Sequence, residues 1–397
     1  MPVTKMSDLD LKGKRVLIRE DFNVPLKNGV ITSDLRIQAA LPTIKAAIKA
    51  GAKVMLMSHL GRPNEGVFEE QFSLAPVARE LSTLLKIDVP LIHDWIDGCN
   101  MGTAQVVLLE NVRFNNGETN NNVELSKKMA SLCDIFVMDA FATSHRAESS
   151  TCGIIKYAKE ACAGPLLLSE LDALNKIMEK PAHPVVAIVG GSKVSTKLAL
   201  LDSLVKKVDA LIIGGGIANT FLAAEGYTVG KSLYEPDLID EAERLTVEAK
   251  QRKAEIPLPV DVIVAEKLSE DADAYVRLVS QIDDTEKVFD IGPDTIKNFI
   301  AVIKKAKTIL WNGPVGAFEI NEFAKGTQAI AKAIAESKAF KVAGGGDTLA
   351  AIEKYNIASK IDYISTGGGA FLTVLEGKKL PVIEELELRV SKNEKVA

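Results

Sequence analysis

The chain has 397 residues, of which 47% are hydrophobic and 25% charged, the composition of a globular protein with apolar material for two or three domains. Its formal net charge of −5 argues against nucleic acid and anionic membranes as partners, and no apolar run approaches the roughly 18 residues of a membrane span. The N-terminal segment is acidic and lacks a secretory signal, and the four cysteines and four histidines show no disulfide or zinc spacing. We therefore expect a cytoplasmic protein without disulfides or structural zinc.

The first half of the chain alternates apolar strands with helical segments. A hairpin tip is predicted at 27–29, and Pro42 falls inside one helix, which it could kink or divide. The strands are predicted at 14–19, 53–58, 106–109 and 135–138, and the helices at about 33–50 and 73–85. Such βα repeats predict a parallel sheet whose strands all end at one edge.

Basic side chains follow these strands where they end. A cluster of cations at one sheet edge, in a chain with a net negative charge, predicts a small and highly anionic ligand, because guanidinium groups bind carboxylate and phosphate in a bidentate way. Asp21 and Asn23 would bind a hydroxyl group. For any single arginine the alternative is an ordinary surface ion pair. The basic residues are Arg36, His59, Arg62, Arg113, His145 and Arg146.

A helix between the halves begins at Pro165 and ends before Pro181 and Pro184. Helix breakers at both ends are typical of a hinge between two domains. A helix that simply covers one domain fits this stretch equally well.

Five apolar strands in the second half each end in a glycine-rich loop. We expect one parallel sheet whose carboxyl edge is formed by glycine loops without side chains. A nucleotide phosphate tail would bind there to free backbone N–H groups. Lys193 and Lys197 stand beside the first of these turns, four residues apart, which predicts that they share one side of the following helix. No Walker A loop is present. The strands are 185–189, 211–213, 308–311, 340–343 and 363–366; further strands are expected at 260–265 and 288–291, and helices at 236–253 and 293–306.

These elements predict an α/β fold with two Rossmann-like parallel-sheet domains and a hinge helix between them. The predicted segments are an N-terminal acid-binding domain at 1–165, the hinge helix at 166–180, a C-terminal nucleotide-binding domain at 181–378, and a charged tail at 379–397 that packs back on the N-terminal domain.

An anion site on one domain and a nucleotide site on the other predict phosphoryl transfer, with Asp347 approaching a magnesium ion directly or through water. No catalytic base motif is present, which favours a carboxylate acceptor because it is already ionised at pH 7. A dehydrogenase would need a G-x-G-x-x-G loop, and none of the glycine loops fits. The alternative is a non-catalytic two-domain anion-binding protein.

Seven motifs, spread over essentially the whole chain, resemble those of the phosphoglycerate kinase family. They are REDFNVP at 19–25, SHLGRP at 58–63, ENVRF at 110–114, GGSKV at 190–194, LWNGP at 310–314, GGGDT at 344–348 and STGGGA at 365–370. The resemblance implies reversible transfer of a phosphoryl group from 1,3-bisphosphoglycerate to ADP, giving 3-phosphoglycerate and ATP, with Mg²⁺. It also implies a cytoplasmic, glycolytic monomer that closes by hinge bending.

The same resemblance assigns residues by position in the motifs. The 3-phosphoglycerate ligands would be Asp21, Asn23, Arg36, His59, Arg62, Arg113 and Arg146. Arg36 and Lys193 would act on the transferred phosphoryl group. The nucleotide would be held by Lys197, Gly214, Gly215, Gly216, Asn312, Glu319, Gly345, Gly346, Asp347 and Thr348, and Asp347 would meet the magnesium. Ala142 and Val288 stand where the family commonly has glycine, so a backbone contact from position 288 to the nucleotide is not carried over.

Overall fold

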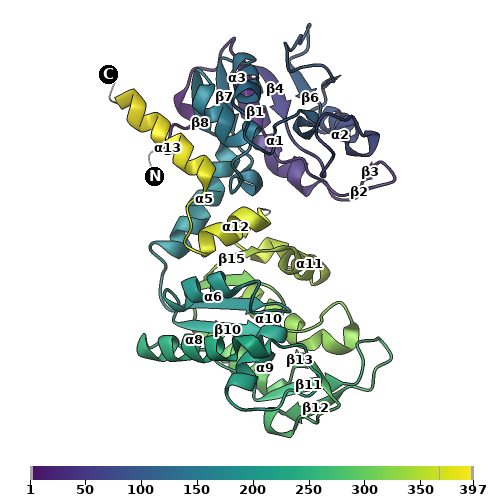
Figure 1. Cartoon of the computed structure of the whole chain (residues 1–397), viewed down its shortest axis with the longest axis vertical. Coiled ribbons are helices and arrows are strands. Elements are labelled where there is room, and N and C mark those ends of the chain that lie inside the picture. Colours follow the sequence, from purple (N-terminus) through teal and green to yellow (C-terminus); the bar gives the residue numbers. More distant parts are fainter. Residues whose placement is uncertain (1–2, 366, 395–397) are drawn as a thin grey trace. The chain divides into compact units, whose positions relative to one another are not determined.

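The structure, a computed structural model, describes residues 3–365 and 367–394 and divides into two compact units (Figure 1). Unit 1 contains the chain up to Asp172 and again from Lys379, and unit 2 is the continuous stretch Ala173–Lys378. Both are mixed α/β units built on a parallel sheet, as predicted from the sequence. None of the described helices combines the length and the apolar character needed to cross a membrane.

Unit 1 is built on a six-stranded sheet in the order β5-β6-β4-β1-β7-β8, with every pair parallel. Its inner strands are buried, apart from the exposed first residue of β1 and of β4, because helices cover both faces of such a sheet. The strands are β1 (Arg15–Arg19), β4 (Lys53–Met57), β5 (Leu91–Ile92), β6 (Val106–Leu109), β7 (Ile135–Met138) and β8 (Glu160–Ala163). The four predicted strands are confirmed, whereas the two edge strands, β5 and β8, were not predicted.

The helices of unit 1 are α1 (Leu35–Lys49), α2 (Ala75–Leu85), α3 (Val123–Ser131) and α4 (Ile154–Tyr157). Pro42 lies on the exposed side of α1, and the helix continues through it without dividing. The predicted hairpin tip is also present: β2 (Leu26–Lys27) pairs with β3 (Val30–Ile31), and Asn28 and Gly29 both have positive φ, as a tight turn of this kind requires.

The C-terminal helix α13 (Pro381–Glu394) belongs to unit 1, where it packs on α4 and β8. Val382 and Leu386 are buried, and Glu385 forms a 3.0 Å ion pair with Lys156. Nη2 of Arg389 donates to two carbonyl oxygens of the loop between α4 and β8, each at 2.8 Å. Residues 395–397 of the predicted tail lie outside the described residues.

The helix α5 (Pro165–Met178) leads out of unit 1, and the division between the units falls within it, between Asp172 and Ala173. Its first turn is fixed to unit 1, since Oδ1 of Asp139, just after β7, accepts a hydrogen bond from the backbone N–H of Leu167 at 3.0 Å.

Unit 2 contains a five-stranded parallel sheet in the order β10-β9-β14-β15-β16, formed by the five strands predicted from their glycine-rich ends. Residue 366, the last of the fifth predicted strand, lies outside the described residues. The strands are β9 (Val185–Gly190), β10 (Ala210–Gly214), β14 (Thr308–Asn312), β15 (Phe340–Gly344) and β16 (Tyr363–Ser365). The helices are α6 (Leu198–Val205), α7 (Gly216–Ala224), α8 (Ile239–Gln251), α9 (Pro293–Lys305), α10 (Lys325–Glu336), α11 (Gly346–Lys354) and α12 (Gly368–Leu375).

Unit 2 also has a separate antiparallel sheet in the order β12-β11-β13. The sequence predicted β11 (Asp261–Ala265) and β13 (Lys287–Ile291) but not their mutual pairing, and it missed β12 (Tyr275–Leu278). That strand is mostly exposed on both faces, so it lacks the apolar pattern from which strands are predicted.

The glycine loops of unit 2 meet in backbone contact. A Cβ on Gly190 would lie 1.6 Å from the carbonyl oxygen of Pro314, and one on Gly214 would lie 2.4 Å from Cα of Val315. No side chain can be accommodated at either position without moving a strand end, so these glycines are required by packing.

We expect Gly190→Ala to destabilise unit 2 by at least about 2 kcal/mol, since the obstacle is backbone rather than a movable side chain. Thermal unfolding would measure this, with Gly346→Ala as the matched control, because a Cβ on Gly346 meets nothing within 4 Å. Equal melting temperatures for the two variants would contradict the packing argument.

Candidate functional site

The first half of the candidate site lies in unit 1, where side chains that follow β1 are connected to the first turn of α1. Arg36 forms a 2.9 Å ion pair with Asp21 and donates to the backbone oxygen of Asn23, also at 2.9 Å. Oδ1 of Asn23 in turn accepts from the backbone N–H of Gly61 at 2.9 Å, which ties this group to the loop after β4. The structure therefore joins three of the predicted substrate residues through hydrogen bonds.

Three of the predicted arginines, Arg62, Arg113 and Arg146, line one cavity of about 360 Å³. Nη1 of Arg113 donates to the carbonyl of Gly61 at 2.7 Å, and its Nη2 pairs with Glu148 at 3.0 Å. Glu148, which no sequence motif indicates, also lies 3.9 Å from Nη1 of Arg146. It holds two of the arginines in place while leaving the cavity with an excess of positive charge.

His59 is only 3% exposed and carries a neutral ring. Burial, together with the positive charges of Arg19, Arg113, Arg146 and Arg36, holds the pKa of His59 well below its ordinary value. The ring is therefore a hydrogen-bonding group and not a cation. His145 is also held neutral, since burial and Arg146 lower its pKa, and its Nε2 accepts from Nε of Arg146 at 3.2 Å.

The second half of the candidate site is a cavity of about 690 Å³ in unit 2. One side consists of bare loops at the carboxyl ends of β9 and β10, and the other is an apolar wall contributed largely by the segment before η6 (Pro236–Leu238) and by β13. The lining includes the predicted residues Gly215, Gly216, Glu319 and Asp347, and the wall residues Leu233, Tyr234, Leu268, Val288 and Phe289. The cavity thus has one side suited to a polyanion and another suited to a flat apolar group.

The prediction that Lys193 and Lys197 share a face of the following helix is wrong. Helix α6 begins only at Leu198, and both lysines belong to the loop before it. Ser195, which lies between them, donates from its backbone N–H and its hydroxyl to the carboxylate of Glu235, at 2.8 and 2.6 Å, and this holds the segment in a turn. As a result Lys193 is exposed, while Lys197 points into the structure.

Lys197 lies beneath the glycine loops. Its Nζ donates to the carbonyl of Gly190 and to Oδ1 of Asn312, the latter at 2.8 Å. Burial lowers the pKa of Lys197 to about 8, partly offset by the negative charge of Asp347. A phosphate group bound here would restore the full charge of this lysine.

Other predicted nucleotide residues connect the loops and do not line the cavity. Nδ2 of Asn312 donates to the carbonyl of Gly344 at 2.7 Å, and the hydroxyl of Thr348 accepts from the N–H of Gly313 at 2.7 Å. Gly345 has a φ of +100°, which only glycine adopts readily, and Gly346 begins α11. These contacts fix the loop between β15 and α11 beside Asp347. Gly214 is packed against Val315, as described above.

Asp347 fits the role predicted for a magnesium ligand. It is exposed, lines the cavity, and its carboxylate makes no hydrogen bond or ion pair within the described part of the chain. Mg²⁺ in nucleotide sites is commonly held by one or two carboxylates together with phosphate oxygens and water, so a single free carboxylate suffices. Among the described residues, no group of three or more acidic, histidine or cysteine side chains forms a site for a metal alone.

The two departures from the family pattern are accommodated. Ala142 lies in the turn η4 (Phe141–Thr143) and is not among the residues with positive φ, so its methyl group causes no backbone strain. Val288 lines the cavity of unit 2, and its N–H donates to the hydroxyl of Ser232 at 2.8 Å.

The apolar wall of this cavity was missed by sequence reasoning. Its residues come from irregular loops and from a sheet whose pairing is not local, so no short motif marks them.

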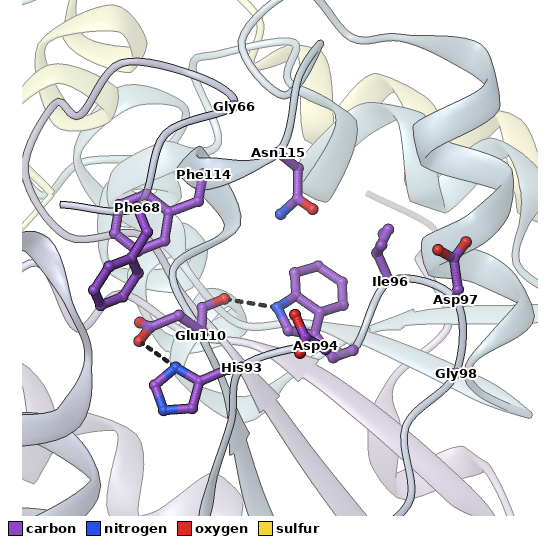
Figure 2. A pocket seen from close by; sticks show the side chains of 11 residues that line it. Gly66, Phe68, His93, Asp94, Ile96, Asp97, Gly98, Glu110, Phe114 and Asn115 are labelled. Carbon is purple, nitrogen blue, oxygen red and sulfur yellow. Dashed lines mark hydrogen bonds and ion pairs between the residues drawn. The ribbon is translucent and has the colours of Figure 1, made fainter. Parts of the chain in front are cut away.

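A third cavity, of about 910 Å³, lies at the ends of β5 and β6 and contains none of the predicted site residues (Figure 2). Its most buried polar group, Glu110, uses its carboxylate to accept from the hydroxyl of Ser73 and the N–H of Leu74, and pairs with His93 at 3.4 Å. The indole N–H of Trp95 donates to the backbone oxygen of Glu110 at 3.0 Å. These bonds are internal to the fold, so we read the cavity as structural.

The titration of Lys197 leads to a prediction about pH. Because a neutral lysine no longer attracts phosphate, the affinity for the predicted ligand, ADP, should fall as the pH rises above about 8, by up to about tenfold for each further pH unit. Isothermal titration calorimetry from pH 7 to pH 10 would measure it. Lys197→Arg should show a flat profile, since a guanidinium group stays charged; the same decline in both proteins would contradict the assignment.

Comparisons with known proteins identify the family. The family model for phosphoglycerate kinase matches residues 6–378. A curated phosphoglycerate kinase of Nitratidesulfovibrio vulgaris (strain Miyazaki F) is 59% identical over 392 residues, covering 99% of this chain and all of the relative. The solved structure of phosphoglycerate kinase from Coxiella burnetii is 57% identical in sequence to this chain, with a TM-score of 0.94. The solved structure of phosphoglycerate kinase from Pyrococcus horikoshii OT3 is 33% identical, with a TM-score of 0.82. Each of the two comparisons covers 98% of this chain and 100% of the solved chain. The chain therefore belongs to the phosphoglycerate kinase family, whose members are kinases with a carboxyl group as phosphoryl acceptor.

Proposed function

We propose that this protein catalyses the reversible transfer of a phosphoryl group from 1,3-bisphosphoglycerate to ADP, giving 3-phosphoglycerate and ATP, with Mg²⁺ accompanying the nucleotide. The main support for the proposal is that this chain, a member of the family, has two cavities: one lined by arginines in unit 1 and one lined by glycines in unit 2. Each lies at the carboxyl edge of a parallel sheet, where ligands of such sheets bind.

In unit 1, Arg62, Arg113 and Arg146 would bind the anionic groups of the glycerate, with Arg113 held in place by its bonds to Gly61 and Glu148. Asp21 and Asn23 would bind its hydroxyl group, and the neutral ring of His59 would add one hydrogen bond. Arg36, held by Asp21 at 2.9 Å, would face the acyl phosphate.

In unit 2, the loops around Gly215 and Gly216 leave room for the phosphates, and the apolar wall would accept the adenine ring. Lys197, Asn312, Gly345, Gly346 and Thr348 would shape the phosphate side of the cavity, and Glu319 would bind the ribose side. Asp347 would hold Mg²⁺, which neutralises phosphate charge when bound.

The transferred group would be stabilised by Arg36 and Lys193, which offset the charge on its oxygens. Because the acid and the nucleotide bind to different units, we propose that closure about α5 aligns them and excludes the water that would hydrolyse an acyl phosphate. We further propose that the protein acts as a monomer in the cytoplasm, where the nucleotide and the acid are available.

A coupled assay of ATP consumption with 3-phosphoglycerate and Mg²⁺ tests the proposal. Turnover that requires all three components is the expected result. Absence of turnover, with intact binding of both ligands by calorimetry, would favour the non-catalytic two-domain anion-binding protein.

A further inference from the structure

Arg19, the last residue of β1, lies behind the ligand-facing residues of unit 1. Its side chain is 0% exposed, so it cannot touch a bound ligand. A buried guanidinium group is costly unless its donors are used, and here they are directed to named partners. Nε donates to the hydroxyl of Ser150 at 3.0 Å, Nη1 donates to the carbonyl of Glu20, and Nη2 lies 3.3 Å from Nδ1 of His59.

The last of these contacts fixes the proton on the histidine ring. A guanidinium group has donors only, so Nδ1 of His59 must accept from Arg19 and cannot carry a hydrogen. The ring is neutral, so its single hydrogen is on Nε2. His59 can then only donate at Nε2, which suits an anionic oxygen and disfavours a donor group at that position.

Arg19 is itself held by a buried acid. The hydroxyl of Ser150, which accepts from Arg19, donates to Oε1 of Glu118, while the backbone N–H of Ser150 donates to Oε2 of the same carboxylate at 3.0 Å. Burial lowers the pKa of Arg19, and the negative charge of Glu118, which is fully buried, opposes that shift. Glu118, Ser150, Arg19 and His59 thus form one chain of hydrogen bonds, which we call the positioning chain.

We infer that Arg19 is a positioning residue of the anion site, which acts through His59 by fixing it as the Nε2–H tautomer through the positioning chain. The inference rests on the proposed function only for the identity of the bound acid. The tautomer itself is a property of the free protein.

The first test is therefore made on the wild-type protein without ligand. Nitrogen NMR of the histidine-labelled full-length chain, assigned by the loss of one signal set in His59→Gln, should show a protonated Nε2 and an unprotonated Nδ1 for His59. The signals should not titrate between about pH 6 and pH 8, where an ordinary histidine does. A proton on Nδ1, or an ordinary titration, would overturn the inference whether or not the protein has kinase activity.

The second test separates positioning from general stability. Arg19→Gln should raise the KM for 3-phosphoglycerate by about tenfold or more while leaving the KM for ATP within about twofold, and Arg19→Lys, which keeps a donor-only cation, should restore part of the loss. Arg15→Gln is the matched control, because Arg15 is on the same strand but is exposed and paired with Asp134 at 3.0 Å. Equal changes in both KM values would overturn the inference.

A double-mutant cycle completes the test. If Arg19 acts through His59, Arg19→Gln should have little further effect on the KM for 3-phosphoglycerate in a His59→Ala background. Should Arg19→Gln not fold, Ser150→Ala replaces it in the cycle, since that variant leaves the guanidinium in place and removes the hydroxyl that links it to Glu118. Effects that add fully in the cycle would show that Arg19 does not act through His59.

Discussion

Replacing Lys193 with alanine is expected to lower kcat by more than about 100-fold with only a modest change in either KM, because the lysine would act mainly on the charge that moves in the transition state. The structure indicates that this substitution should leave the fold intact. Lys193 is exposed, and within the described part of the chain its ammonium group makes no hydrogen bond or ion pair that the substitution could break.

Steady-state kinetics in both directions would measure the effect, with two controls. Lys207→Ala removes another exposed lysine of unit 2, beyond the end of α6, and should leave turnover unchanged. Lys193→Arg keeps the charge and should recover part of the activity. Near-normal turnover in Lys193→Ala would refute the role assigned to this residue.

Arg62→Ala should raise the KM for 3-phosphoglycerate by roughly 10- to 100-fold, the loss typical of a hydrogen-bonded charge pair, and leave the KM for ATP nearly unchanged. Arg62 lines the anion cavity and is exposed, so it is available to a ligand, whereas Arg113 is already engaged with Glu148. Its removal therefore deletes a ligand contact with little effect on the fold.

The matched control is Arg79→Ala, which removes an exposed arginine of α2 that does not line the cavity. Initial rates with each substrate varied in turn give the two KM values. A parallel rise in both would mean that the assignment of acid and nucleotide to different units is wrong.

Most of the parallel sheets could be predicted, because long apolar strands followed by glycine or by basic residues are local patterns. The strand order, such as β9 lying between β10 and β14, could not be predicted, since it depends on pairing between segments far apart in the chain. Short or exposed strands such as β5, β8 and β12 lack the pattern altogether. In the antiparallel sheet of unit 2, β11 and β13 were predicted as strands, but their pairing was not, because it too joins segments that are far apart in the chain.

The candidate site divides in a similar way. Residues at strand ends, such as Arg62 and Asp347, could be named because motif and position agree. The conformation of the loop from Lys193 to Lys197 could not be predicted, because it depends on a hydrogen bond from Ser195 to Glu235, about 40 residues further along the chain. Glu148 and Arg19 likewise act through partners that only the fold brings near; Arg19 begins the motif at 19–25, but the sequence indicates no role for it.

The return of the chain to unit 1 has a consequence for synthesis on the ribosome. Unit 2 is one continuous stretch and is complete once Lys378 has emerged, but unit 1 still lacks α13, which is synthesised after unit 2. Until then the surface of α4 and β8 that receives Val382 and Leu386 is uncovered, and the carbonyl groups bound by Arg389 face solvent. The unit that is begun first is thus completed after the other, and a nascent chain can contain a finished unit 2 before it has a finished unit 1.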